Sequence, residues 1–109
     1  MCGITGVIDP KRETAPDFLT RNITAMSDRL LHRGPDASDV FVDADKGVAF
    51  GFRRLAIQDL SPTGMQPMTS PDGRFLCIYN GEIYNFRELK RDLEGRGAVK
   101  WRGSSDTEV

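Results

Sequence analysis

A cysteine at the second position is the residue of this chain best placed to do chemistry. The sequence begins MCGITGVID, so removal of the initiator methionine leaves Cys2 with both a thiol and a free α-amine. A free α-amine titrates at about 7.7–8.0 and a cysteine thiol at about 8.5, whereas a lysine amine titrates at about 10.4. Only the α-amine therefore has an appreciable neutral fraction at neutral pH and can accept the thiol proton. Cys2 can thus act as a nucleophile whose own α-amine is the general base, as in proteins with an N-terminal threonine nucleophile.

Two alternatives stand beside this interpretation of Cys2. Free cysteines commonly behave as small buried apolar residues, and Cys2 precedes an apolar stretch. If Met1 is retained, the α-amine lies in a peptide bond and the base is missing, which would give an inactive or precursor form. The second cysteine, Cys77, is flanked by apolar residues and is expected in the core.

Two further groups could recognise charge. Asn80 has a side-chain NH₂ and Gly81 a backbone N–H that a substrate can approach closely, so together they fit an oxyanion hole. The alternative for this Asn-Gly pair is a plain turn. Arg54, which follows a predicted strand, carries a planar fork that suits a carboxylate, although a pair of arginines is commonly a solvated face.

Composition excludes several classes of partner. The 109 residues suit one domain, with 39% hydrophobic residues, 28% charged residues and a net charge of −1. The absence of a basic stripe disfavours nucleic acid, and the absence of an apolar run of about 18–20 residues disfavours a membrane span. With one histidine and two distant cysteines, no metal site and no disulfide framework is expected, which favours a cytoplasmic location.

Patterns of β-rich residues predict the strands that would hold these groups. Short strands are expected at 3–9 and 99–101, and the runs 39–42 and 47–52 flank an Asp/Gly turn that predicts a hairpin. The stretch 74–79 is apolar on both faces, so we expect it to be a central strand.

Helical signals follow three capping patterns. Thr14, with an acidic residue three positions on, predicts a cap for an amphipathic helix over 16–31. Asn85 opens a second helix that ends at Gly95. Residues 105–108, SDTE, form a third capping box near the last residue of the sequence, so we expect the chain to stop within a longer domain.

Six ordered motifs carry a family resemblance. MCGITGVID, HRGPD, RRLAIQDL, GMQP, NGEIYN and SDTEV together resemble the glutaminase domain of glutamine-hydrolysing asparagine synthetases, a class II glutamine amidotransferase domain. The resemblance runs from Met1 to Val109 and implies that 1–109 is the N-terminal portion of that domain, with no synthetase domain present. It implies an α+β fold, the αββα sandwich of N-terminal-nucleophile hydrolases with antiparallel sheets between helices, incomplete in this chain.

The resemblance also implies a reaction. In that family the cysteine thiolate attacks the side-chain amide of glutamine, ammonia leaves, and water releases glutamate from a γ-glutamyl thioester. By this likeness the catalytic residues are Cys2, Asn80 and Gly81, the last two as the oxyanion hole. The motif HRGPD is then a scaffold loop, so His32 is not expected to be the base.

Substrate-binding roles come from the same resemblance. They fall on Arg54, which would hold the α-carboxylate of glutamine, on the backbone around Leu55 and Ile57, and on Glu82 and Asp106, which would receive the α-ammonium. Asp106 has an alternative as a helix-start residue favoured by the helix dipole. Both roles can hold at once.

The resemblance places other partners outside this chain. Ammonia would serve ATP-dependent asparagine synthesis, yet no Gly-rich pyrophosphate-binding loop occurs here, so ATP and Mg²⁺ are expected only in the missing synthetase domain. Glutamine, the C-terminal synthetase domain and a second copy in a homo-oligomer are the expected partners. Two alternatives remain open: the glutaminase domain of another amidotransferase, of the glucosamine-6-phosphate synthase type, or a truncated non-catalytic fragment that acts as a binding module.

Overall fold

The chain folds into a mixture of helices and antiparallel sheets. The computed structural model describes residues 2–97 and 99–109, and it divides them into two compact units. Unit 1 covers the chain up to Leu55 together with Met65–Asn80, and unit 2 covers Ala56–Gly64 together with Gly81–Val109. Two helices and two antiparallel sheets make this an α+β chain, as the sequence predicts.

A three-stranded sheet forms the centre of unit 1. Its strands are β1 (Gly3–Ile8), β2 (Ala37–Asp43) and β3 (Val48–Arg54), in the order β1-β3-β2 with both pairs antiparallel. The hairpin predicted from the Asp/Gly turn is confirmed as β2 and β3. The first predicted strand is confirmed as β1, although Ile8 in this edge strand is 74% exposed and only one of its faces is buried.

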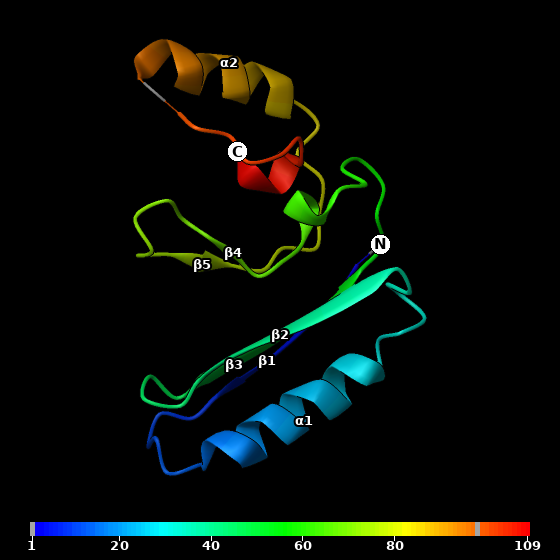
Figure 1. The fold of residues 1–109 in the computed structure, drawn as a ribbon, viewed down its shortest axis with the longest axis vertical. Helices are drawn as coiled ribbons and strands as arrows, with labels where there is room; N and C mark the ends of the chain where they lie inside the picture. Colours follow the sequence, from blue (N-terminus) through cyan, green and yellow to red (C-terminus); the bar gives the residue numbers. More distant parts are fainter. Residues whose placement is uncertain (1, 98) are drawn as a thin grey trace. The chain divides into compact units, whose positions relative to one another are not determined.

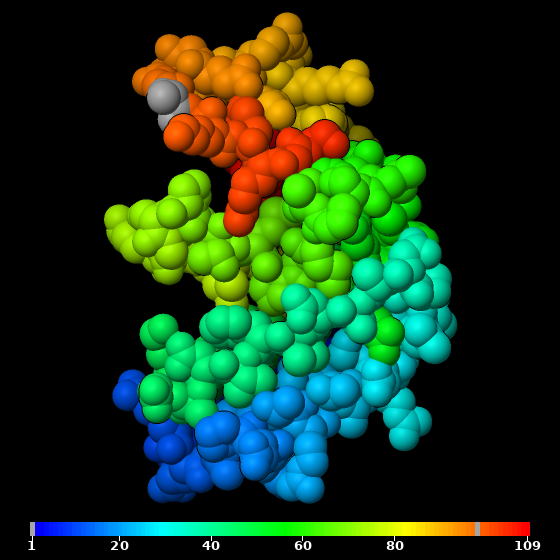
Figure 2. All heavy atoms as spheres, viewed as in Figure 1, coloured from blue at the N-terminus to red at the C-terminus, as the bar shows by residue number. Residues whose placement is uncertain are grey.

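Helix α1 (Pro16–Asp28) covers one face of that sheet (Figure 1). Leu19 and Ile23 of the helix pack against Ala49 of β3, and all three are at most 2% exposed. In the space-filling view the spheres of α1 lie directly against those of the hairpin (Figure 2). Burial of side chains of this size contributes roughly 1.5–3 kcal/mol each, so this contact is the main core of unit 1.

The predicted start and end of α1 need correction. Ala15, not Thr14, occupies the N-cap position, and an alanine side chain has no atom that could accept a capping hydrogen bond. Thr14 lies before the helix, where its N–H donates to Asp9 Oδ2 at 2.9 Å. The helix ends at Asp28 rather than at 31. Beyond it the chain tightens into turns, with the Leu30 N–H donating to the Ser27 carbonyl at 2.9 Å.

The second sheet of unit 1 overturns the prediction of a central strand at 74–79. Only β5 (Leu76–Cys77) is a strand there, and it pairs with β4 (Met68–Thr69). Cys77 is exposed rather than in the core, and Phe75 is 64% exposed. The central strand is β3 instead. Figure 1 draws the β4–β5 pair on the side of the first sheet away from α1. Phe52 is 1% exposed, and because side chains alternate along a strand it lies on the opposite face of β3 from Ala49, which packs against α1.

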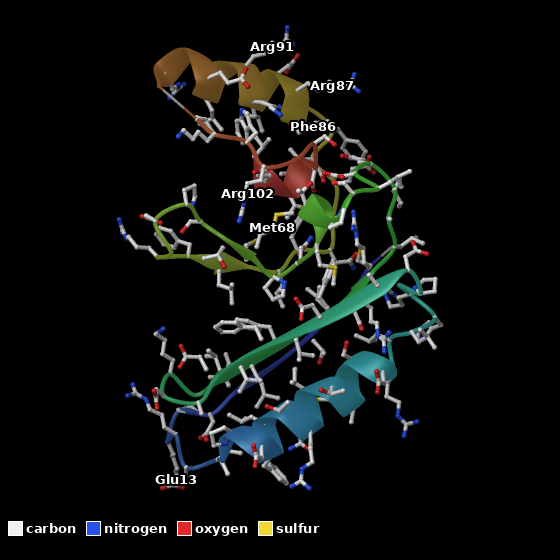
Figure 3. The ribbon with its side chains drawn as sticks, viewed as in Figure 1. Glu13, Met68, Phe86, Arg87, Arg91 and Arg102 are labelled. Carbon is white, nitrogen blue, oxygen red and sulfur yellow. The ribbon has the colours of Figure 1, made fainter. Side chains whose placement is uncertain are left out.

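Unit 2 is built from α2 (Phe86–Arg96) and two short 3₁₀ turns, η1 (Pro62–Gly64) and η2 (Asp106–Glu108). Asn85 is the N-cap position of α2 as predicted, although its side chain makes no capping bond. Figure 3 shows Arg87 and Arg91 on the surface of this helix, which has no buried residue.

No strand forms at 99–101, so that prediction is wrong. Trp101 lies against α2 instead: its Nε1 donates to Glu94 Oε1 at 2.7 Å, and the Lys90 ammonium sits 4.8 Å from its ring centroid. The short run at 99–101 contacts a helix instead of pairing in a sheet. Its residue types fit either arrangement, so the sequence alone could not distinguish them. Within the described residues, no helix has the length and apolar character needed to cross a bilayer.

Candidate functional site

The thiol of Cys2 is held by backbone at the end of β3. The Leu55 N–H donates to Cys2 Sγ at 3.4 Å, and the thiol donates to the Leu55 carbonyl at 3.6 Å. Gly3 pairs with Arg53 across the sheet, so the register continued by one residue sets Cys2 opposite Arg54. The antiparallel pairing therefore brings three of the predicted site residues, Cys2, Arg54 and Leu55, to one end of the sheet.

A second contact fixes the backbone of Cys2. Arg33 Nε donates to the Cys2 carbonyl oxygen at 3.2 Å, so the residue is held at both its side chain and its carbonyl. Sequence reasoning assigned the HRGPD motif to the scaffold and missed Arg33. The sequence did contain a signal for Arg33. Its side chain is permanently charged, it lies inside the HRGPD motif, and the Gly-Pro pair that follows limits the directions in which the side chain can point.

The HRGPD loop approaches β3 more closely than a side chain would allow. A Cβ on Gly34 would stand 2.7 Å from the Arg54 nitrogen and closer still to the Arg53 carbonyl group. The Asp36 N–H donates to the Arg54 carbonyl at 3.0 Å, which continues the contact to the start of β2. Glycine at position 34 therefore lets Arg33 reach Cys2 while the loop stays packed on the strand.

The two adjacent arginines of RRLAI have different surroundings. Arg53 donates from Nε to the Ser27 carbonyl at 3.2 Å and pairs through its guanidinium with Asp28, so it ties β3 to the end of α1. Arg54 is 7% exposed and lies opposite Cys2 when the register of β1 and β3 is continued by one residue. Arg53 is thus a structural arginine that joins β3 to α1, and Arg54, the residue that sequence reasoning expects to bind a carboxylate, is buried at the Cys2 end of the sheet.

Asn80 closes unit 1, and its position is set by the preceding residue. The Tyr79 N–H donates to Gln66 Oε1 at 2.5 Å, and Gln66, from the GMQP motif, is 5% exposed. A buried amide oxygen that accepts a backbone N–H holds that backbone at a defined place. The half-buried Asn80 follows directly.

Unit 2 holds the other predicted residues. Glu82 is exposed and accepts from Gln58 Nε2 at 3.0 Å, which links the NGEIYN motif to RRLAIQDL. Asp106 is 6% exposed, and its Oδ2 accepts the Ile83 N–H at 2.8 Å. Two hydrogen bonds thus tie together the stretches that carry four predicted site residues: Ile57, Gly81, Glu82 and Asp106. Ile57 itself is 68% exposed.

Each unit therefore carries part of the predicted chemistry. Unit 1 holds Cys2, Arg54, Leu55 and Asn80, which supply a thiol, a guanidinium and an amide. Unit 2 carries the two carboxylates expected to receive an ammonium, Glu82 and Asp106. Among residues 2–97 and 99–109, no three histidine, cysteine or acidic side chains come together in a way that could hold a metal ion. Met1, whose removal the nucleophile needs, lies outside the described residues.

Comparison with protein families identifies one match over the chain. The family described as "Glutamine amidotransferase domain" matches residues 1–109. The match covers both units, so the fold and the proposed site residues lie within it.

Curated relatives are mostly much longer proteins. "Asparagine synthetase [glutamine-hydrolyzing] 1" of Bacillus subtilis is 42% identical over 111 residues. "Asparagine synthetase [glutamine-hydrolyzing] 1" of Arabidopsis thaliana is 36% identical over 109 residues, and "Amidase chry2" of Gibberella zeae is 33% identical over 116. Each match uses 100% of this chain, but the chain spans only 17% of the length of each relative.

Proposed function

Because the chain belongs to the glutamine amidotransferase domain family, we propose that it hydrolyses glutamine to glutamate and ammonia with Cys2 as the nucleophile. The observation that carries this proposal is the fixed Cys2 thiol, which donates to and accepts from the backbone of Leu55 while Arg33 holds the Cys2 carbonyl. A cysteine held in this way, at a point where trimming exposes its α-amine, unites nucleophile and base in one residue.

The first half of the reaction forms a covalent intermediate. The α-amine of Cys2 takes the thiol proton, and the thiolate attacks the side-chain carbonyl carbon of glutamine. The resulting oxyanion is stabilised by the side-chain NH₂ of Asn80 and the backbone N–H of Gly81. When the carbon–nitrogen bond breaks, the protonated α-amine gives its proton to the departing nitrogen, so ammonia leaves and a γ-glutamyl thioester remains.

The second half restores the enzyme. Water attacks the thioester carbonyl while the α-amine, now neutral, accepts a proton from it. The tetrahedral intermediate is stabilised at the same two donors and collapses to release glutamate. The sulfur recovers its proton from the α-ammonium, so all atoms and protons balance over one turnover.

Charges at the other end of the substrate would select glutamine. Arg54 would pair with its α-carboxylate, since a guanidinium and a carboxylate match in a bidentate fork. Glu82 and Asp106 would receive the α-ammonium, and the backbone around Leu55 and Ile57 would line the pocket. Two carboxylates for the α-ammonium and one guanidinium for the α-carboxylate suit a zwitterionic amino acid.

We further propose that 1–109 is the N-terminal portion of an N-terminal-nucleophile hydrolase domain. The helix and two antiparallel sheets of unit 1 would correspond to three layers of an αββα sandwich, which supports this assignment. In the complete polypeptide a synthetase domain would bind ATP and Mg²⁺ and use the ammonia to make asparagine, as the names of two relatives suggest. Because "Amidase chry2" is not named as an asparagine synthetase, the glutaminase domain of another amidotransferase stays the second candidate.

Glutamate release from glutamine tests the reaction. In the complete polypeptide that contains this chain, Cys2→Ala is expected to abolish glutamate release, because no other group described here replaces the thiol. Cys77→Ala is the matched control: Cys77 is an exposed cysteine outside the proposed site and its loss should leave the rate unchanged. Equal turnover by Cys2→Ala and the parent protein would remove the nucleophile assignment, and no turnover by the parent would favour a non-catalytic module.

A further inference from the structure

Unit 2 contains a buried carboxylate that the proposed reaction does not use. Asp59 is 7% exposed, and its Oδ1 accepts from Ser61 N at 2.8 Å and Ser61 Oγ at 2.6 Å. Its Oδ2 accepts from Ser104 N at 2.9 Å and Thr63 Oγ1 at 3.2 Å. These donors, the Ser61 hydroxyl first and the Ser104 N–H next, hold the pKa of Asp59 well below its usual range.

The hydrogen bond to Ser104 spans a long stretch of sequence and fixes a turn. Beside it, Gly103 comes so close that a Cβ there would stand 2.6 Å from Asp59 Oδ2 and would also overlap the Thr63 hydroxyl. Only a residue without a side chain fits this approach. Asp59 is therefore the fixed point onto which the 103–104 turn closes.

That turn leads directly into η2, which carries Asp106. Ser105 is the N-cap of η2, as the SDTE pattern predicts, and its Oγ accepts the Thr107 N–H at 3.2 Å. The reciprocal bond of a capping box, from the Ser105 N–H to the Glu108 side chain, is replaced by other contacts of Glu108. The Glu108 carboxylate folds back and accepts hydrogen bonds from the backbone N–H of Arg102, at 2.5 Å, and of Gly103, at 2.9 Å. Figure 3 shows Arg102 on the segment that leads into η2. The stretch from 102 to 108 is thus a closed turn whose attachment point is Asp59.

Both carboxylates assigned to the substrate ammonium depend on this arrangement. Asp106 is carried by the turn, and its Oδ2 accepts the Ile83 N–H at 2.8 Å. Glu82 is held by Gln58, the residue adjacent to Asp59 in the chain, at 3.0 Å. Two consecutive residues of one loop therefore hold the two carboxylates in place: Gln58 bonds Glu82, and Asp59 bonds the turn that carries Asp106.

We propose that Asp59 is a positioning residue that sets Asp106 and Glu82 at the separation needed to bind the α-ammonium of the substrate. The inference rests on the proposed function, since it assumes that these two carboxylates receive that group. Asp59 does not touch substrate; it acts through the turn. A carboxylate is required because both of its oxygens accept two donors each, whereas the amide of asparagine would turn an NH₂ toward one of these donor pairs.

The test is Asp59→Asn in the complete polypeptide, with kcat and KM for glutamine measured separately. We expect KM to rise at least tenfold while kcat changes less than threefold, because Cys2 and its α-amine belong to unit 1 and keep their own contacts. The rate at which iodoacetamide alkylates Cys2 in the absence of substrate does not depend on binding of a substrate α-ammonium, so it should stay within twofold. Asp72→Asn is the matched control: Asp72 accepts from Ser70 Oγ at 2.6 Å in an exposed turn of unit 1, and its replacement should leave KM unchanged.

A double variant separates positioning from general loss of structure. If Asp59 acts through Asp106 as well as Glu82, the rise in KM of Asp59→Asn/Asp106→Asn should be smaller than the product of the two single rises, whereas independent effects would multiply. Ser61→Ala, which removes one exposed donor, gives a milder version that is expected to raise KM about threefold and serves if Asp59→Asn does not fold. An unchanged KM in Ser61→Ala and Asp59→Asn, multiplicative effects in the double variant, or a fall in kcat alone would overturn the inference. Failure of the parent protein to release glutamate would instead overturn the proposed function.

Discussion

Two neighbouring arginines are chemically identical, yet their surroundings give them different tasks. Arg53 holds β3 to the end of α1 through its contacts with the Ser27 carbonyl and Asp28. Arg54 is buried at the end of the sheet where Cys2 is held. Charge recognition at the scale of one residue is therefore expected at Arg54 and not at Arg53.

Exchange of each arginine for alanine tests this division. Arg54→Ala should raise the KM for glutamine roughly 10–100-fold, because a hydrogen bond to a charged group contributes about 1.5–3 kcal/mol. Arg53→Ala should leave KM within about threefold and lower the free energy of unfolding by up to ~1 kcal/mol, since its partner Asp28 is largely exposed. Steady-state kinetics and urea denaturation distinguish the two effects. A KM for Arg54→Ala equal to that of the parent would contradict the carboxylate role.

At the scale of elements, the contact between the HRGPD loop and β3 fixes the position of Cys2. The loop supplies Arg33 to the Cys2 carbonyl, and Gly34 lets the loop lie on the backbone of Arg53 and Arg54. Because the strand and the loop share this contact, a change in the loop displaces the strand end that holds the thiol.

Glycine-to-alanine exchanges test the contact directly. Gly34→Ala in the 109-residue chain should lower the free energy of unfolding by about 1–3 kcal/mol, since its Cβ meets backbone that cannot move aside. Gly95→Ala is the matched control: Gly95 lies in α2 with nothing within 4 Å of an added Cβ, and alanine there should stabilise by up to ~1 kcal/mol. Urea denaturation measures both. A loss of stability at Gly95 as large as that at Gly34 would count against steric contact as the cause.

Sequence patterns predicted the elements whose signal is local. The hairpin of β2 and β3 and the helices α1 and α2 follow from turn residues and from apolar periodicity, which act over a few residues. The stretch 74–79 could not be placed in the same way. Its apolar residues indicate a strand that could be buried on both faces. Whether other elements cover those faces depends on the tertiary fold, and Phe75 is exposed in the structure.

At the scale of the whole molecule, the predicted site residues divide between two units. Cys2, Arg54, Leu55 and Asn80 belong to unit 1, and the other four belong to unit 2. The family motifs identified these eight positions because each motif is a short continuous string. Arg33 and Asp59 were missed as positioning residues because their partners, Cys2 and Ser104, lie 31 and 45 residues away in sequence.

The central claim is that the α-amine of Cys2 activates its own thiol, and one rate measurement tests it most directly. Glutamate release is compared between the complete polypeptide shown by intact mass to begin at Cys2 and the same polypeptide with one alanine added ahead of Cys2. The addition keeps the thiol but converts the base into an amide, so the rate should fall at least ~100-fold. Glutamate should still protect Cys2 from iodoacetamide at a similar concentration, which would show that the binding of glutamate is retained. Equal rates of glutamate release from the two proteins would contradict the account.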